Sequence, residues 1–402
     1  MSETLDWRQL AVLITALMAT GIGQSLVFAI LAPLGREVAL SELQITSIIS
    51  LSALVFGLAS PLWGRFSDRV GRKPVIIIGL IGYTVGTLLF TSVFYAGLTG
   101  MLSGLTLYVV ALLARCAQSL VMSATGPAST AFAADHTAPA GRTRAMAKLG
   151  TANSMGMILG PAVSGALAAF GLLAPLYFAG ALSASAAVLV WRMLPVTPPR
   201  DRRQRPGPER LRFSDPRLRA LVLTAIALFT GFSAIQQTLG FLVQDTLSLD
   251  GIGTAQMTGA VLMVSATFTF IVQVTAMQWL KLQPGTFIRL GLLCMLCGAA
   301  ILGSSGSFML LAAGMGFLGA GLGLTMPAIT AGASLAVDAD EQGGAAGLIA
   351  ACPAIGFIAG PLCGGLLYQI EAFLAPLFAA LIFFLALLVL TLKRQAGGRS
   401  TR

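Results

Sequence analysis

Long apolar runs separated by short polar segments occupy almost the whole chain. A helix needs roughly 20 apolar residues to cross the hydrocarbon core of a membrane, because that core is about 30 Å thick and each helical residue rises about 1.5 Å. Backbone polar groups cannot stay unpaired in lipid, so each run is predicted to be helical. The pattern predicts twelve spanning helices, over residues 9–32, 44–64, 74–95, 99–123, 146–169, 174–194, 218–243, 255–280, 286–304, 307–331, 343–367 and 373–392.

The composition excludes an ordinary soluble protein. Hydrophobic residues make up 56% of the 402 residues and charged residues only 10%, whereas a soluble domain carries about 25% charged residues. The first apolar run is longer than the core of a signal peptide, which has about 7–15 residues, and we interpret it as a retained span. The five cysteines lie in or beside apolar runs and are expected to be packing residues. No metal and no cofactor are expected.

The cations predict the orientation of the chain in the membrane. With the N-terminus placed in the cytoplasm, every Lys and Arg lies on the cytoplasmic side except Arg36, which falls outside, and Arg115, which falls within a span. Positively charged residues favour cytoplasmic loops, so both termini are predicted to be cytoplasmic in a bacterial plasma (inner) membrane. The net charge of +10 is then explained by these cytoplasmic cations; the lipid bilayer is an expected partner, and no nucleic-acid partner is expected. The protein is expected to be monomeric.

A segment rich in Arg and Pro divides the chain in two. Residues 195–217 are predicted to be a cytoplasmic linker between one six-helix bundle, residues 1–194, and a second, residues 218–402. Residues 156–167 and 356–367 are identical at half of their positions. An offset of 200 also aligns the segment that begins at Thr125 with the one that begins at Thr325. The predicted fold class is therefore an all-α membrane protein with twelve transmembrane helices in two six-helix repeat bundles.

One charged segment between two apolar runs resembles a known family signature. It contains a glycine, an acid, a base, a second glycine and two bases, carried by Gly64, Asp68, Arg69, Gly71, Arg72 and Lys73. This order resembles the signature between spans 2 and 3 of the major facilitator superfamily. The charges predict a short cytoplasmic loop, with tight turns at Gly64 and Gly71. The resemblance implies that this segment, with Asp68 at its centre, is a conformational latch that engages the other half of a transporter.

Two further elements carry the same resemblance. Arg115 and Gln118 resemble the family's Arg-x-x-Gln element in span 4, although Ser119 stands where a glycine is usual. Residues 156–165 resemble the span 5 element of the twelve-span drug:proton antiporter branch. Glycines one turn apart favour close helix packing, and proline permits a bend. Helix packing and kinks are therefore expected at Gly156, Gly160, Pro161, Gly165, Gly356, Gly360 and Pro361.

The candidate chemistry centres on Arg115. It is the one charge clearly within a predicted span, where a charge is costly and indicates function, and its equivalent in the second repeat is Met315. The resemblance implies that Arg115 lines the cavity or takes part in proton coupling. No carboxylate lies clearly mid-span, so Asp245 and Glu42 are the candidate proton carriers. Other candidate substrate contacts are polar or aromatic residues of apolar helices: Gln24, Phe28, Gln118, Asn153, Gln236 and Gln237.

These features predict a secondary active transporter. We expect a proton-coupled exporter (antiporter) that moves small amphipathic, neutral or anionic molecules by alternating access. A strongly cationic substrate is disfavoured, because no carboxylate would neutralise it within the membrane. Two alternatives remain: a dedicated exporter of an endogenous metabolite, such as a siderophore or another organic acid, and a proton symporter for uptake. No catalytic or nucleotide-binding motif occurs, so neither an enzyme nor direct ATP coupling is expected.

Overall fold

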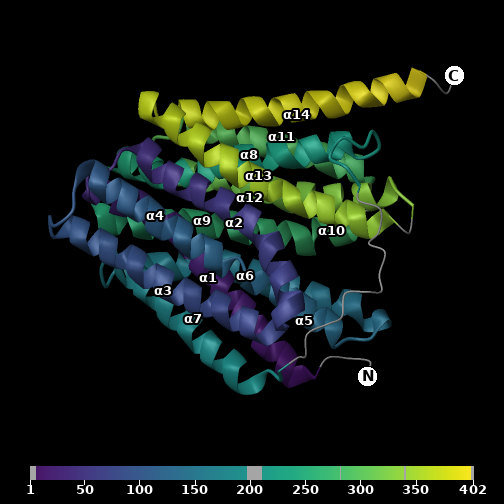
Figure 1. Cartoon of the computed structure of the whole chain (residues 1–402). Coiled ribbons are helices and arrows are strands. Elements are labelled where there is room, and N and C mark those ends of the chain that lie inside the picture. Colours follow the sequence, from purple (N-terminus) through teal and green to yellow (C-terminus); the bar gives the residue numbers. More distant parts are fainter. Residues whose placement is uncertain (1–5, 197–210, 281, 339–340, 400–402) are drawn as a thin grey trace. The chain divides into compact units, whose positions relative to one another are not determined.

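The computed structural model describes residues 6–196, 211–280, 282–338 and 341–399 (Figure 1). Every regular element in these ranges is a helix, as predicted. The first seven helices are α1 (Trp7–Glu37), α2 (Glu42–Val70), α3 (Arg72–Leu98), α4 (Gly104–Met122), α5 (Thr125–Asp135), α6 (Pro139–Ala168) and α7 (Ala174–Met193). They are followed by α8 (Arg219–Leu247), α9 (Gly251–Val274), α10 (Ala276–Trp279), α11 (Pro284–Gly303), α12 (Phe308–Leu335), α13 (Gln342–Ile370) and α14 (Leu374–Arg399).

Within the described residues, eleven helical segments are long and apolar enough to cross a membrane. α4 and α5 are separated by only two residues and together form one of these segments. The one predicted span outside this set is α6, which has 30 residues. Its first turns carry Arg142, Arg144 and Lys148, and small or polar residues follow them. α6 is thus a helix of spanning length with a weaker apolar character than its neighbours.

The chain folds into two compact units. Unit 1 comprises the described residues of Met1–Arg205 and Asp250–Ala260, and unit 2 those of Pro206–Leu249 and Val261–Arg402. α9 therefore begins in unit 1 and continues in unit 2. In unit 1, α1 packs along α6 and α7, and α3 packs along α4 and α7. In unit 2, α8 packs along α13, and α11 packs along α12 and α14. Most of the predicted linker, residues 197–210, lies outside the described residues.

The sequence repeat corresponds to two matched helix crossings. In unit 1, the Ser25 hydroxyl of α1 donates a hydrogen bond of 3.3 Å to the Gly156 carbonyl of α6. In unit 2, the Ser233 hydroxyl of α8 donates one of 2.9 Å to the Gly356 carbonyl of α13. One turn further along α6 and α13, a Cβ on Gly160 or on Gly360 would overlap the same serine hydroxyls. The paired glycines therefore lie at close crossings of α1 with α6 and of α8 with α13.

The remaining residues of these two segments lie nearby. A Cβ on Gly165 would lie 3.2 Å from the Gln256 carbonyl, at the start of α9 within unit 1. α6 continues through Pro161, and α13 continues through Pro361, without an interruption of the helix.

The charged segment 64–73 is not the loop that its composition predicts. α2 continues to Val70 and α3 begins at Arg72, so only Gly71 lies outside a helix, with a φ of 102°. Gly64 lies inside α2, where an added Cβ would make only an ordinary contact of 3.7 Å with Pro127. The prediction of a tight turn at Gly64 is therefore wrong. Hydropathy marks where the apolar core ends, but a helix can continue for two more turns when its side chains are solvated.

Other boundaries also differ from the predicted ones. The span predicted over 99–123 begins at Gly104 and, after a break at Ser123 and Ala124, continues as α5 to Asp135. α8 extends four residues beyond its predicted end at residue 243 and includes Asp245 in its last turn.

Candidate functional site

A buried polar cluster lies where α4 packs on α3 in unit 1. Arg115 Nη1 donates a hydrogen bond of 2.6 Å to Gln118 Oε1, and Gln118 Nε2 donates one of 2.6 Å to Thr87 Oγ1. The Arg115 guanidinium carbon lies 5.6 Å from the centre of the Phe90 ring, in reach of a cation–π contact. Together with Tyr83, whose carbonyl also accepts from Gln118 at 3.5 Å, these residues form what we call the Arg115 cluster.

Helical spacing brings the five residues together. Arg115 and Gln118 are three residues apart on α4, and Tyr83, Thr87 and Phe90 recur at four- and three-residue intervals on α3, so each set shares one helix face. Gly86 lies between them on α3, and a Cβ there would be only 2.6 Å from the Cβ of Gln118. The sequence identified the two α4 residues but not the three α3 residues. The only sequence feature that could have indicated the α3 residues is the four-residue spacing of Tyr83 and Thr87 in an apolar run.

The cluster is almost fully inaccessible and incompletely paired. Arg115 is 5% exposed, and Tyr83, Thr87 and Gln118 are at most 2% exposed. Arg115 forms no ion pair with any carboxylate among the described residues. Arg115 Nε and the Tyr83 hydroxyl have no hydrogen-bond partner. A buried unpaired polar group costs about 1–3 kcal/mol, and a charged one costs more, so the cluster destabilises unit 1 unless something else compensates it.

The second repeat shows that this crossing does not need polar residues. A Cβ on Gly79 would overlap the Thr125 hydroxyl, and a Cβ on Gly291 would overlap the Thr325 hydroxyl, which fixes the correspondence between the two halves. In this register, Met295 and Ala299 of unit 2 correspond to Tyr83 and Thr87. Met315 and Leu318 correspond to Arg115 and Gln118. All four unit 2 residues are apolar and fully buried. Packing alone therefore does not explain the polar cluster of unit 1.

Two residues of the predicted latch, Asp68 and Arg72, belong to an ion-pair group within unit 1. Arg72 is 7% exposed and pairs with Asp68 at 2.5 Å and with Asp135, at the end of α5, at 3.0 Å. It also donates to the Ser67 hydroxyl at 2.6 Å, and Lys73 donates to the Leu194 carbonyl at 2.5 Å. Asp135 and Ser67 were not identified from the sequence. Arg69 is exposed.

The candidate substrate contacts differ in their surroundings. On α8, Gln236 and Gln237 are 9% and 6% exposed, and Oε1 of the first and Nε2 of the second have no partner. On α1, Gln24 and Phe28 are half-buried, and Asn153 of α6 is exposed. These amides leave hydrogen-bonding capacity open within each unit.

The two candidate proton carriers lie at helix ends and are engaged. Glu42, the first residue of α2, pairs with Arg36 at 2.8 Å. Asp245 accepts a hydrogen bond of 2.6 Å from the Tyr368 hydroxyl of α13, within unit 2. Both carboxylates therefore already have a partner, and protonation of Glu42 would neutralise its ion pair with Arg36.

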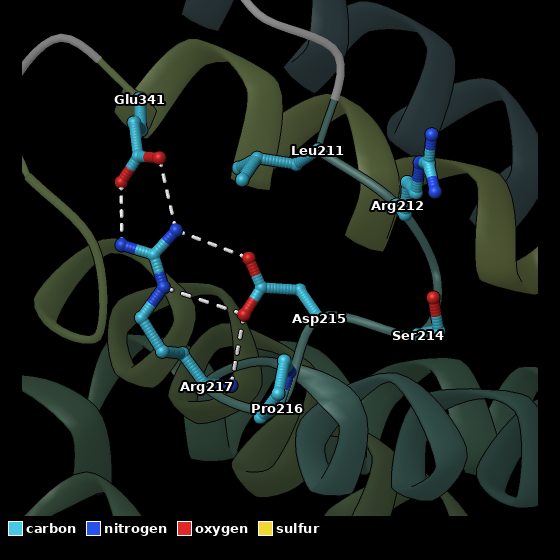
Figure 2. Close-up of a pocket in the computed structure, with 7 residues that line it drawn as sticks. All are labelled: Leu211, Arg212, Ser214, Asp215, Pro216, Arg217 and Glu341. Atoms are coloured by element: carbon cyan, nitrogen blue, oxygen red, sulfur yellow. Dashed lines mark hydrogen bonds and ion pairs between the residues drawn. The ribbon is translucent and has the colours of Figure 1, made fainter.

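Figure 2 shows an ion-pair clamp in unit 2 that the sequence did not reveal. The Arg217 guanidinium donates two hydrogen bonds to the Glu341 carboxylate, of 2.7 and 2.9 Å. It also donates two to the Asp215 carboxylate, of 3.0 and 3.3 Å. The clamp joins the start of α8 to the start of α13 beside an open hollow of about 460 Å³, also lined by Arg212. Hydrogen bonds from Arg217 lower the pKa of Glu341 and the pKa of Asp215. The hydrogen bonds that Arg217 donates to Glu341 and Asp215 also raise the pKa of Arg217 itself.

Acid should release this clamp. Because both carboxylates have depressed pKa values in the folded protein, their contribution is present above their ordinary pKa values of 3.8 and 4.5. It is lost as the pH falls through the folded values. The wild-type melting temperature should therefore fall more steeply below pH 4.5 than that of Glu341→Gln. At neutral pH the difference should be only about 1–2 °C, since exposed ion pairs are weak.

Tryptophan fluorescence during heating, recorded as a function of pH, measures this difference. Arg212→Gln is the matched control, since Arg212 lines the same hollow but forms no ion pair among the described residues. Parallel pH profiles for wild type and Glu341→Gln would contradict a stabilising clamp.

Comparisons with known proteins agree with this architecture. A family model described as Major Facilitator Superfamily matches residues 13–305. The chain is 27% identical over 367 residues to "Multidrug resistance protein 1" of Bacillus subtilis (strain 168), covering 90% of each chain. It is also 27% identical over 416 residues to "Tetracycline resistance protein, class C" of Escherichia coli, covering 98% of each. A crystal structure of a mutant of the nucleoside transporter NupG superposes with a TM-score of 0.75 at 13% identity, over 97% of this chain and 99% of that one. These likenesses confirm the predicted fold class.

Proposed function

The chain belongs to the Major Facilitator Superfamily and is a transporter of small molecules, and from this premise we propose that it is a proton-coupled exporter. Its likeness to proteins named for multidrug and tetracycline resistance, over 90% or more of the chain, carries the proposal of export. The glycine–proline segment of α6, which resembles the drug:proton antiporter element, supports the same direction. Transport then proceeds by alternating access.

We further propose that the substrates are amphipathic and neutral or anionic. Every described Asp and Glu lies at a helix end or between helices, so none would neutralise a strongly cationic substrate within the membrane. Unpaired amides on α8 offer hydrogen bonds to neutral groups. Gln24, Phe28, Asn153 and Gln118 are the other proposed contacts. Export of one endogenous organic acid is the second candidate, and the uncompensated charge of Arg115 favours it. Proton symport for uptake is the third, and the α6 segment argues against it.

Three parts of the mechanism complete the proposal. Protons bind at Asp245 or at Glu42. The segment 64–73 acts as the latch, with Asp68 exchanging its partner Arg72 for another when the transporter changes state. The protein is monomeric, with a cytoplasmic linker at residues 195–217 between the bundles 1–194 and 218–402, and both termini lie in the cytoplasm of a bacterium.

Accumulation in proteoliposomes tests the substrate class. The purified chain is reconstituted with an acidic interior and offered matched cationic, neutral and anionic fluorescent compounds. We expect neutral and anionic compounds to accumulate above the level of protein-free vesicles, and cationic ones not to. Selective accumulation of cations would contradict the proposed substrate class.

A further inference from the structure

We infer that the Arg115 cluster is a binding site for a small monovalent anion, formed by the Arg115 guanidinium and the Tyr83 hydroxyl inside unit 1. The ligand is an inorganic anion such as chloride, or the carboxylate group of a small acid. This goes beyond the proposed function, because the site could be filled whatever molecule is transported.

The first argument is charge. Arg115 is 5% exposed, and no carboxylate among the described residues pairs with it. Its compensation consists of a neutral amide oxygen and an aromatic ring. Removing an unpaired guanidinium from water costs several kcal/mol, and a bound anion offsets this cost directly.

The second argument is hydrogen-bonding capacity. Arg115 Nε can only donate, and the Tyr83 hydroxyl can donate as well; both are buried without a partner. The Thr87 hydroxyl lies beside that of Tyr83, but no hydrogen bond of normal geometry joins them. Arg115 and Tyr83 are also close enough to interact electrostatically. Two donors beside one positive charge match an anion better than they match water, which brings protons of its own.

The third argument is that the surrounding residues hold these donors in place. Gln118 fixes one guanidinium nitrogen, and the Phe90 ring lies against the guanidinium. A Cβ on Gly23 of α1 would overlap the Tyr83 hydroxyl, so this glycine admits the end of the tyrosine ring. At the equivalent crossing of unit 2, Met295 and Met315 replace Tyr83 and Arg115. The donors are thus specific to unit 1.

Thermal unfolding at constant ionic strength tests the inference. The full chain in lipid nanodiscs is heated in sodium gluconate, a large anion, with increasing chloride or, in a second series, acetate. We expect chloride to raise the melting temperature saturably, by about 2–5 °C. Tyr83→Phe should raise the half-saturating chloride concentration at least about tenfold. Arg115→Gln should abolish the rise in melting temperature. Met315→Leu, in the equivalent position of unit 2, should respond like wild type.

The two series distinguish the sources of the anion. A response to chloride alone identifies an inorganic-ion site, and a response to acetate as well identifies a site that accepts carboxylates. Equal melting temperatures in all anions, or a chloride effect that persists in Arg115→Gln, would overturn the inference. If a variant does not fold, crystals of the wild type in bromide decide the question. Anomalous density between Arg115 and Tyr83 supports the site, and its absence contradicts it. Because these measurements need no transport, their failure would leave the exporter proposal standing.

Discussion

Replacing the Arg115 cluster by its counterparts from unit 2 is expected to abolish transport and leave the protein folded. The fourfold variant Tyr83→Met, Thr87→Ala, Arg115→Met and Gln118→Leu introduces the residues that pack fully buried at the equivalent crossing. Replacing both partners of a buried hydrogen bond by well-packed apolar groups of similar shape is nearly neutral or stabilising. The melting temperature should therefore equal or exceed that of wild type, while substrate accumulation falls to the level of protein-free vesicles.

The single variant Arg115→Met provides the control for this experiment. It leaves the Gln118 oxygen without its donor, so it should melt below the fourfold variant although it removes fewer polar groups. A fourfold variant that transports like wild type would show that the cluster has no role in function. One that fails to fold would show that the cluster is structural.

Filling the crossing between α1 and α6 is expected to destabilise the protein severely. A Cβ on Gly156 would lie 2.6 Å from the Met18 carbonyl oxygen and 2.9 Å from the Ile22 nitrogen, both backbone atoms that cannot rotate away. Gly156→Ala should cost about 1–3 kcal/mol, and Gly156→Leu more than about 3 kcal/mol. Melting temperature and the yield of monodisperse protein after extraction measure the effect.

Two further glycines make this experiment specific. Gly356 occupies the equivalent crossing of unit 2, where an added Cβ would meet the backbone of Phe229 and Thr230, so Gly356→Leu should be equally damaging. Gly150 lies on α6 itself with nothing within 4 Å of an added Cβ, so Gly150→Leu should be tolerated. Equal melting temperatures for Gly156→Leu and Gly150→Leu would contradict the packing that we describe.

The positions of the helices could be predicted from the sequence, but their ends could not. Apolar runs identify where lipid must be crossed, and the sequence repeat at Gly156 and Gly356 identifies equivalent helix crossings in the two halves. Hydropathy does not register the solvated turns that carry α2 to Val70 or α8 beyond Asp245. The break within the fourth span, at Ser123 and Ala124, also leaves no hydrophobic signal.

The site was predictable only in part, for a related reason. A charge in an apolar run stands out, so Arg115 was identified, whereas Tyr83 and Thr87 are ordinary residues of an apolar helix until α4 is placed beside them. The clamp between Arg217 and Glu341 joins residues 124 positions apart, and no local pattern can reveal such a pair. Pairing between distant segments has to come from the fold.

The most direct test of the central claim is accumulation by the purified chain under gradients of opposite polarity. Proteoliposomes with an acidic interior, an alkaline interior and no gradient are offered the same neutral or anionic compound. If the chain is a proton antiporter, the compound accumulates only in vesicles with an acidic interior. This accumulation is lost when a protonophore collapses the gradient. Accumulation that is unchanged by the protonophore would contradict proton coupling, and accumulation only with an acidic exterior would identify a symporter instead.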